Sequence, residues 1–180
     1  MAQTLSDAAL VVVDMQQVFA DPASPWHIAG LAEILPRVTA LMPRFRRSVL
    51  TRFVAPAEPR GAWAAYYAAY PFALRCPDAP LYALLPPLAL IGARCIDATT
   101  FSKWGPALQK ATGGASALVL CGVATETCVL ATALAAADSG VRVHVVPEAC
   151  AGSAPPVHAA ALAVLAAQSP LIELTPLSGL

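Results

Sequence analysis

Short apolar runs rich in β-branched residues alternate along the chain with longer stretches rich in alanine and leucine. The short runs predict strands at 9–13, 48–51, 117–120 and 141–146, with a last short strand at 171–174. The longer stretches predict helices at 31–46, 105–111, 126–139 and 156–167. Continuous apolar strands separated by helices are typical of a parallel sheet covered on both faces. We therefore predict an α/β fold with a doubly wound, mostly parallel sheet between two layers of helices.

The segment from Ala55 to Pro87 departs from this alternation. It is rich in proline and aromatic residues, and it is too long for an ordinary connection. We expect a short helix at 62–69 within it. Three roles are open for this segment: it covers the binding site, contacts a neighbouring subunit, or forms a small hydrophobic cluster beside the core. The chain of 180 residues suits one domain (1–180).

Charge and composition narrow the possible partners. Eleven basic and eleven acidic residues give a formal net charge of zero, and the largest basic cluster is Arg44-Phe-Arg46-Arg47, so we expect no nucleic-acid partner. Charged residues and prolines interrupt the apolar stretches before they reach membrane-spanning length, and no leader pattern opens the chain. Because only 12% of residues are charged, we expect a homo-oligomer whose subunits cover apolar surface.

The cysteines indicate a reducing compartment. They are five in number and lack paired C-x-x-C spacing, which fits neither a disulfide framework nor a zinc ribbon. We therefore expect a cytoplasmic protein. Four of them, Cys76, Cys95, Cys121 and Cys150, are interpreted as small buried hydrophobic residues.

The fifth cysteine, Cys128, lies in the run Leu118-Val-Leu-Cys-Gly-Val-Ala-Thr-Glu-Thr-Cys-Val-Leu-Ala-Thr132. This run predicts a buried strand, a tight glycine turn and a helix that carries Cys128 in its first turn. Free backbone N–H groups and the partial positive charge at a helix start favour a thiolate, and the same groups can hold an oxyanion. Cys128 is therefore a candidate nucleophile that ionises easily.

Asp14 ends the apolar run Leu10-Val-Val-Val-Asp14. A carboxylate there is costly unless it is solvated, hydrogen-bonded or paired. As a functional residue it would take the thiol proton and later deliver it to a leaving nitrogen. The alternative is a helix cap or turn residue.

These two segments, with Met15-Gln16 after the aspartate, resemble the isochorismatase-like cysteine hydrolases. In that family the first strand ends in Asp-Met-Gln and the cysteine follows Gly-Val-x-Thr; Thr51-Arg-Phe53, Gly61-Ala-Trp63 and the segment 137–149 are further shared elements. The resemblance implies the same α/β fold, with Cys128 and Asp14 as catalytic residues. It also implies a cis peptide between Val123 and Ala124, with the N–H groups of Ala124 and Cys128 as oxyanion donors.

The third expected catalytic residue is a lysine directly after the pair Ile96-Asp97, where this chain has Ala98. Three explanations compete. In the first, Lys103 replaces the expected lysine by reaching back into the site. In the second, the chain lacks the lysine and its hydrolysis is impaired. In the third, the loop is aligned incorrectly with the family pattern. Lys103 is otherwise a plain surface lysine.

The same family's nicotinamidase branch carries an Asp-x-His metal motif after the second strand. Here Thr51-Arg-Phe-Val-Ala-Pro56 has no histidine, and His27, His144 and His158 have no ligand spacing, so we expect no catalytic metal and no cofactor. For Arg52 we consider two roles: contact with a substrate carboxylate or carbonyl, or a surface salt bridge. Four aromatic residues are candidates for the pocket wall or else belong to the core: Phe19, Trp63, Phe101 and Trp104.

The resulting hypothesis is a metal-independent cysteine hydrolase that cleaves the C–N bond of a small amide, carbamoyl or ureido compound through a thioester. One alternative is hydrolysis of an isochorismate-like vinyl ether, which relies on the aspartate. Another is an impaired family member that binds a small ligand as an oligomer.

Overall fold

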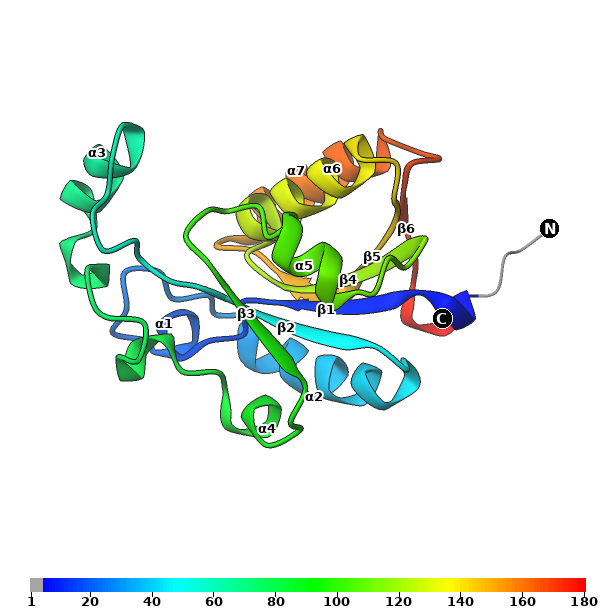
Figure 1. Ribbon diagram of the computed structural model, residues 1–180, viewed down its shortest axis with the longest axis horizontal. Coiled ribbons are helices and arrows are strands. Elements are labelled where there is room, and N and C mark those ends of the chain that lie inside the picture. Colours follow the sequence, from blue (N-terminus) through cyan, green and yellow to red (C-terminus); the bar gives the residue numbers. More distant parts are fainter. Residues whose placement is uncertain (1–4) are drawn as a thin grey trace.

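A computed structural model describes residues 5–180 of the chain. Its centre is one six-stranded sheet in the order β3-β2-β1-β4-β5-β6, and every neighbouring pair of strands is parallel (Figure 1). The strands are β1 (Ala9–Val13), β2 (Ser48–Phe53), β3 (Arg94–Ala98), β4 (Ala117–Val123), β5 (Arg142–Ala151) and β6 (Ile172–Leu174). The predicted doubly wound, parallel α/β fold is confirmed.

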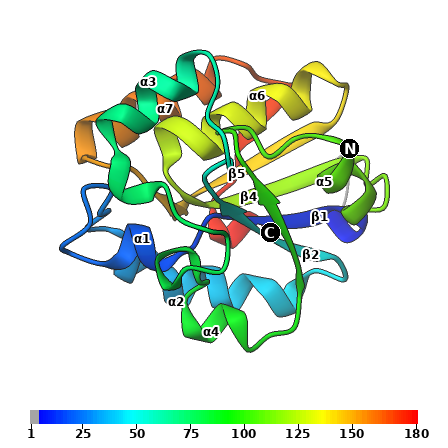
Figure 2. The ribbon, with the colours of Figure 1, turned by 60° about the vertical axis from the view of Figure 1, so that its left-hand side comes forward.

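Helices cover both faces of the sheet. They are α1 (Gln17–Ala20), α2 (Leu31–Leu41), α3 (Ala62–Ala69), α4 (Pro86–Ala89), α5 (Pro106–Ala111), α6 (Leu130–Asp138) and α7 (Pro155–Ala166). In Figure 2, α6 and α7 lie above the strands, and α2 and α4 lie below them. Because both faces are covered, all five residues of β1 are buried.

The apolar pattern misses the strand β3. This strand lies at the edge of the sheet, and its five residues are exposed or only partly buried. An edge strand that faces water needs no continuous apolar run, so periodicity alone does not reveal it.

Two predicted helices have different bounds in the structure. The helix expected at 31–46 ends at Leu41 and passes into a 3-10 turn, Met42–Arg44, because Pro43 lacks an N–H and its ring clashes with a preceding helical carbonyl. The helix expected at 126–139 is divided into a π-helical turn, Thr125–Val129, and α6.

The long connection between β2 and β3 packs partly into the core, where Tyr67, Tyr82 and Leu88 are buried. It holds α3, at the bounds expected from the sequence, and α4. In Figure 1, α3 lies at the end of the molecule opposite the C-terminus. Nowhere in residues 5–180 does the structure have a helix that is long and apolar enough to cross a membrane.

Candidate active site

The candidate site lies where the strand order of the sheet reverses. β1 pairs with β2 on one side and with β4 on the other, so consecutive connections leave the sheet in opposite directions at this point. Asp14 directly follows β1, and the turn that carries Cys128 directly follows β4. In parallel α/β sheets, ligands bind in the crevice at such a point.

Gly122 allows the ends of β1 and β4 to approach each other closely. Its φ is +113°, a value that L side chains rarely adopt, and a Cβ at this position would lie 2.1 Å from the carbonyl oxygen of Val13. Any side chain here would therefore push the two strand ends apart. The glycine of the predicted tight turn thus brings the turn after β4 close to Asp14.

Cys128 lies in the π-helical turn rather than in the first turn of a regular helix. The carbonyl oxygen of Ala124 accepts hydrogen bonds from the N–H groups of Thr127 (3.2 Å) and Val129 (3.1 Å). Such turns occur frequently at functional sites. The peptide bond between Val123 and Ala124 is cis, as the resemblance implies.

The carboxylate of Asp14 is buried, and each of its oxygens has a polar partner. The hydroxyl of Thr51 donates to Oδ1 at 2.7 Å, and Nζ of Lys103 lies 2.8 Å from Oδ2. The N–H of Asp14 in turn donates to the Thr51 hydroxyl at 3.2 Å. With φ at +49°, Asp14 has a left-handed backbone conformation, which a non-glycine residue retains only where its surroundings enforce it.

Lys103 is drawn into the site by contacts on both its backbone and its side chain. Its N–H donates to the hydroxyl of Thr132 on α6 (2.9 Å), and its ammonium donates to the carbonyl of Thr100 (2.9 Å). The same ammonium lies 4.7 Å from the ring centroid of Phe53. Cation–π attraction and the Asp14 carboxylate together stabilise a charge whose side chain has no exposed surface.

The position of Lys103 excludes two interpretations. The interpretation that the site lacks a lysine is wrong, because Lys103 forms the ion pair with Asp14, and the interpretation of Lys103 as a surface residue is wrong because it is buried. Ala98 is the last residue of β3, where its carbonyl accepts a hydrogen bond from Val54.

The surroundings of Cys128 favour the protonated thiol. Burial raises its pKa most, the charge of Asp14 raises it further, and the charge of Lys103 opposes this in part. The thiol lies within hydrogen-bonding reach of the Asp14 carboxylate. The sequence predicts a thiol that ionises easily at a helix start, and the structure differs because burial beside a carboxylate outweighs that effect.

A cavity of about 300 Å³ adjoins Cys128. Its wall includes two of the predicted pocket residues, Phe19 and Phe101, and both proposed oxyanion residues, Ala124 and Cys128. The other lining residues are Pro25, Trp26, His27, Ile28, Phe53, Tyr66, Tyr70, Glu126, Thr127 and Ser153. Because Tyr66 and Tyr70 come from α3 and its end, the long connection roofs this cavity.

Three predicted pocket residues lie elsewhere. Arg52 forms a bidentate pair with Asp97 on the neighbouring strand, at 2.7 and 2.6 Å, which corresponds to the salt-bridge alternative. Trp63 packs behind the wall, with its ring centroid 5.0 Å from that of Phe101. Trp104 lies in the loop before α5, outside the cavity.

Comparison with known protein families identifies the family of this chain. An isochorismatase domain model matches residues 8–175. The chain belongs to the isochorismatase family. The match covers nearly the whole chain.

Solved isochorismatase-like structures resemble this domain over most of its length. A cysteine hydrolase from Pseudomonas syringae pv. phaseolicola 1448A has a TM-score of 0.84 at 20% identity, covering 99% of this chain and 92% of that one. The pyrazinamidase of Pyrococcus horikoshii, solved in complex with zinc, has a TM-score of 0.74 at 25% identity, covering 94% and 99%.

A mouse (Mus musculus) protein, isochorismatase domain-containing protein 2A, is 45% identical over 69 residues, which are 37% of this chain and 33% of that protein. The matched segment thus spans about a third of the length of this curated relative.

The remaining histidines and cysteines of the isochorismatase domain lie outside the cavity. His158 pairs with the hydroxyl of Thr125 (2.8 Å) and His144 with that of Thr175 (2.9 Å). Within the described part of the chain, no group of three or more histidine, cysteine, aspartate or glutamate side chains is arranged to hold a metal ion. Cys76 and Cys95 are exposed, so their interpretation as buried residues is wrong; Cys121 and Cys150 are buried.

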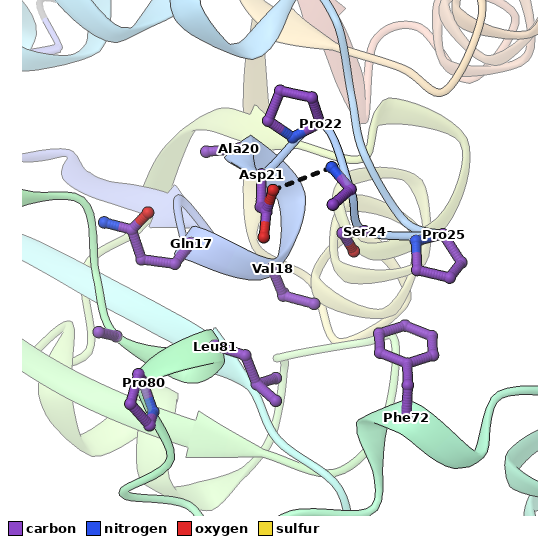
Figure 3. A pocket seen from close by; sticks show the side chains of 12 residues that line it. Gln17, Val18, Ala20, Asp21, Pro22, Ser24, Pro25, Phe72, Pro80 and Leu81 are labelled. Atoms are coloured by element: carbon purple, nitrogen blue, oxygen red, sulfur yellow. Dashed lines mark hydrogen bonds between the residues drawn. The ribbon is translucent and has the colours of Figure 1, made fainter.

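A second, larger hollow of about 860 Å³ lies between α1 with its following loop and the segment 72–83 (Figure 3). Its carboxylate, Asp21, accepts a hydrogen bond from the N–H of Ala23 at 2.9 Å and so closes a local turn. Asp14, Lys103 and Cys128 do not line this hollow. The smaller cavity is the one that Cys128 lines together with an aromatic wall, and Asp14 lies beside this cysteine.

Missing from the sequence prediction were Trp26 and Glu126. Trp26 is a lone aromatic residue in a proline-rich loop, and Glu126 resembles an ordinary helix-start carboxylate. The one signal for Glu126 was its position two residues before Cys128, on the same turn.

Proposed function

We propose that this domain is a metal-independent cysteine hydrolase that cleaves the C–N bond of a small amide, carbamoyl or ureido compound. One observation carries the proposal: a fully buried ion pair, Asp14–Lys103, lies beside the thiol of Cys128, which lines the cavity of about 300 Å³. A buried ion pair is a costly arrangement for stability alone, whereas a proton acceptor beside a thiol has a clear chemical use.

The first step is attack of Cys128 Sγ on the substrate carbonyl carbon. Because the thiol is protonated at rest, its proton passes to Asp14 as the S–C bond forms. Thr51 and Lys103 hold the two carboxylate oxygens in place, which keeps the remaining lone pairs available to the thiol. Lys103 also offsets the negative charge that develops in the site.

The second step is release of the nitrogen. We assign the N–H groups of Ala124 and Cys128 to the oxyanion of the tetrahedral intermediate, since both residues line the cavity. As the intermediate collapses, the C–N bond breaks and Asp14 returns the proton to the nitrogen, which leaves as ammonia or an amine. Water activated by Asp14 then hydrolyses the thioester and regenerates the thiol.

A homo-oligomer remains part of the proposal. Large apolar side chains are exposed on the outer surface, among them Leu90, Val157, Val164 and Leu171. Light scattering coupled to size exclusion would give the mass; a monomer over a wide concentration range would contradict this expectation.

The test of the chemistry is Cys128→Ala against Cys121→Ala, which removes another buried thiol. Ammonia release from a panel of small carboxamides and ureido compounds is measured for both variants, and the acyl-enzyme of the unmodified protein is sought by intact mass and by hydroxylamine trapping. We expect activity in Cys121→Ala and none in Cys128→Ala. Ammonia release that survives Cys128→Ala would overturn the proposal, and hydrolysis of a vinyl ether by this variant would favour the aspartate-dependent alternative.

A further inference from the structure

The cavity wall has an uncompensated negative charge. Of the described residues that line it, Glu126 is the one carboxylate, and none is lysine or arginine. The charge of Asp14 is already balanced by Lys103 at 2.8 Å. His27 is the one lining side chain that can become positive. The wall thus has one carboxylate and no lysine or arginine to balance it.

Glu126 is held in place but has no cationic partner. Its Oε1 accepts a hydrogen bond from the N–H of Ser153 at 2.9 Å, and its buried Oε2 has no hydrogen-bond partner. No ion pair among residues 5–180 includes it. Gly152 leaves room for the carboxylate, since a Cβ there would lie 2.6 Å from Oε2. A carboxylate with one oxygen withdrawn from water is stabilised when a positive charge approaches.

The rest of the wall is suited to bind a cation. Six aromatic residues contribute to it: Phe19, Trp26, Phe53, Tyr66, Tyr70 and Phe101. The ring centroid of Trp26 lies 5.7 Å from that of Phe53, 5.9 Å from that of Tyr66 and 5.6 Å from that of Tyr70. Aromatic faces attract ammonium and guanidinium groups, and the protein's own Lys103 ammonium already lies over Phe53.

We infer that the substrate of this site is a small cationic amide, with an ammonium, quaternary ammonium or guanidinium group placed against the aromatic wall and Glu126 while Cys128 attacks its carbonyl. The amide part rests on the proposed function; the cationic part rests on the wall alone. A carboxylate-bearing ligand would instead meet the charge of Glu126 without any lysine or arginine of the wall to pair with it.

The test compares two amides of the same shape that differ in one atom and in charge. They are trimethylammonioacetamide, a cation, and 3,3-dimethylbutanamide, in which carbon replaces the charged nitrogen. Binding is measured by calorimetry to the full-length Cys128→Ala variant, at about pH 8, where an ordinary imidazole is neutral. Because this variant cannot form the thioester, the outcome is independent of whether the proposed hydrolysis is correct.

We expect the cation to bind about tenfold more tightly than its neutral counterpart. Adding Glu126→Gln should reduce that preference to about threefold or less while the neutral amide binds as before. Adding Glu33→Gln, which removes an exposed carboxylate outside the cavity, should leave the preference unchanged. Melting temperatures of all variants show whether each one is folded.

Tyr70→Leu provides a second variant should Glu126→Gln fail to fold. This variant removes one ring from the wall, and it should weaken the binding of the cation more than the binding of the neutral amide. Equal or weaker binding of the cation would overturn the inference. So would the absence of binding by both amides, or a preference that persists in both Glu126→Gln and Tyr70→Leu.

Discussion

Two regions build the cavity in different ways. The ends of β1, β2 and β4 contribute Asp14, Thr51 and Cys128, which are buried and joined by short polar contacts to one another or to Lys103. The long connection contributes rings such as Tyr66 and Tyr70, which are only partly buried and touch one another edge-on or tilted.

The contrast separates chemistry from recognition. Polar atoms without solvent must be paired, so their geometry is narrowly defined, and a change there alters the reacting groups. Ring contacts are individually weak and tolerant, so a change there alters how well a ligand is held. Variants of the sheet ends should therefore lower kcat, and variants of the roof should raise KM.

The largest expected effect comes from Asp14→Asn, which should lower turnover by about 10²–10⁴-fold because the proton acceptor is lost. The same variant should make Cys128 more reactive towards iodoacetamide. The charge of Asp14 raises the pKa of this thiol and that of Lys103 lowers it, so removing the carboxylate increases the thiolate fraction at a given pH.

Peptide mass spectrometry after labelling at about pH 8 measures this reactivity, in a background carrying Cys76→Ser and Cys95→Ser because those two thiols are exposed. Unchanged turnover in Asp14→Asn would contradict the assignment of Asp14 as the proton acceptor, and reduced labelling would contradict its effect on the thiol pKa.

The next largest effect is expected on protein stability when the Asp14–Lys103 ion pair is broken. Lys103→Met should lower the free energy of unfolding by about 3–5 kcal/mol, because Asp14 is left buried without its counter-charge. Urea denaturation measures this change. Lys110→Met, at an exposed position on α5, is the matched control and should stay within about 0.5 kcal/mol of the unmodified protein. Equal losses in both variants would show that the pair does not matter for stability.

A smaller effect is expected from Thr51, a positioning residue that acts through Asp14. Thr51→Val keeps the shape but removes the hydroxyl that donates to Oδ1, and should lower kcat by about 10- to 100-fold with little change in KM. Thr51→Ser retains the hydroxyl and should restore most of the activity. Steady-state kinetics of both variants tests this expectation. Equal losses of kcat in Thr51→Val and Thr51→Ser would indicate that packing, and not the hydroxyl, is responsible.

The smallest effect belongs to the roof. Tyr70→Ala removes contacts to Trp26, Tyr66 and Phe72, and should raise KM by about 3- to 10-fold while kcat changes by less than about twofold. Ala65→Ser, on the exposed side of α3, serves as the control. A fall in kcat as large as that in Thr51→Val would remove the distinction between the two regions.

Local sequence determined the parts of the site that follow from short-range rules. Apolar runs that end in Asp14 or in the turn with Gly122 specify buried strands and place both segments at one edge of a parallel sheet. The bounds of α3 followed in the same way from its composition. The proposed nucleophile, Cys128, and its proposed proton acceptor, Asp14, were accessible to sequence analysis for this reason.

Tertiary structure alone decided the partners of these residues. Lys103 reaches Asp14 from the loop that follows the exposed edge strand β3, far from Asp14 in the sequence. Arg52 pairs with Asp97 instead of facing the cavity. The same holds for Trp26 and Glu126 in the wall and for the direction of the Cys128 pKa shift. Burial and charge at a site depend on every segment packed around it, and no short stretch of sequence contains that information.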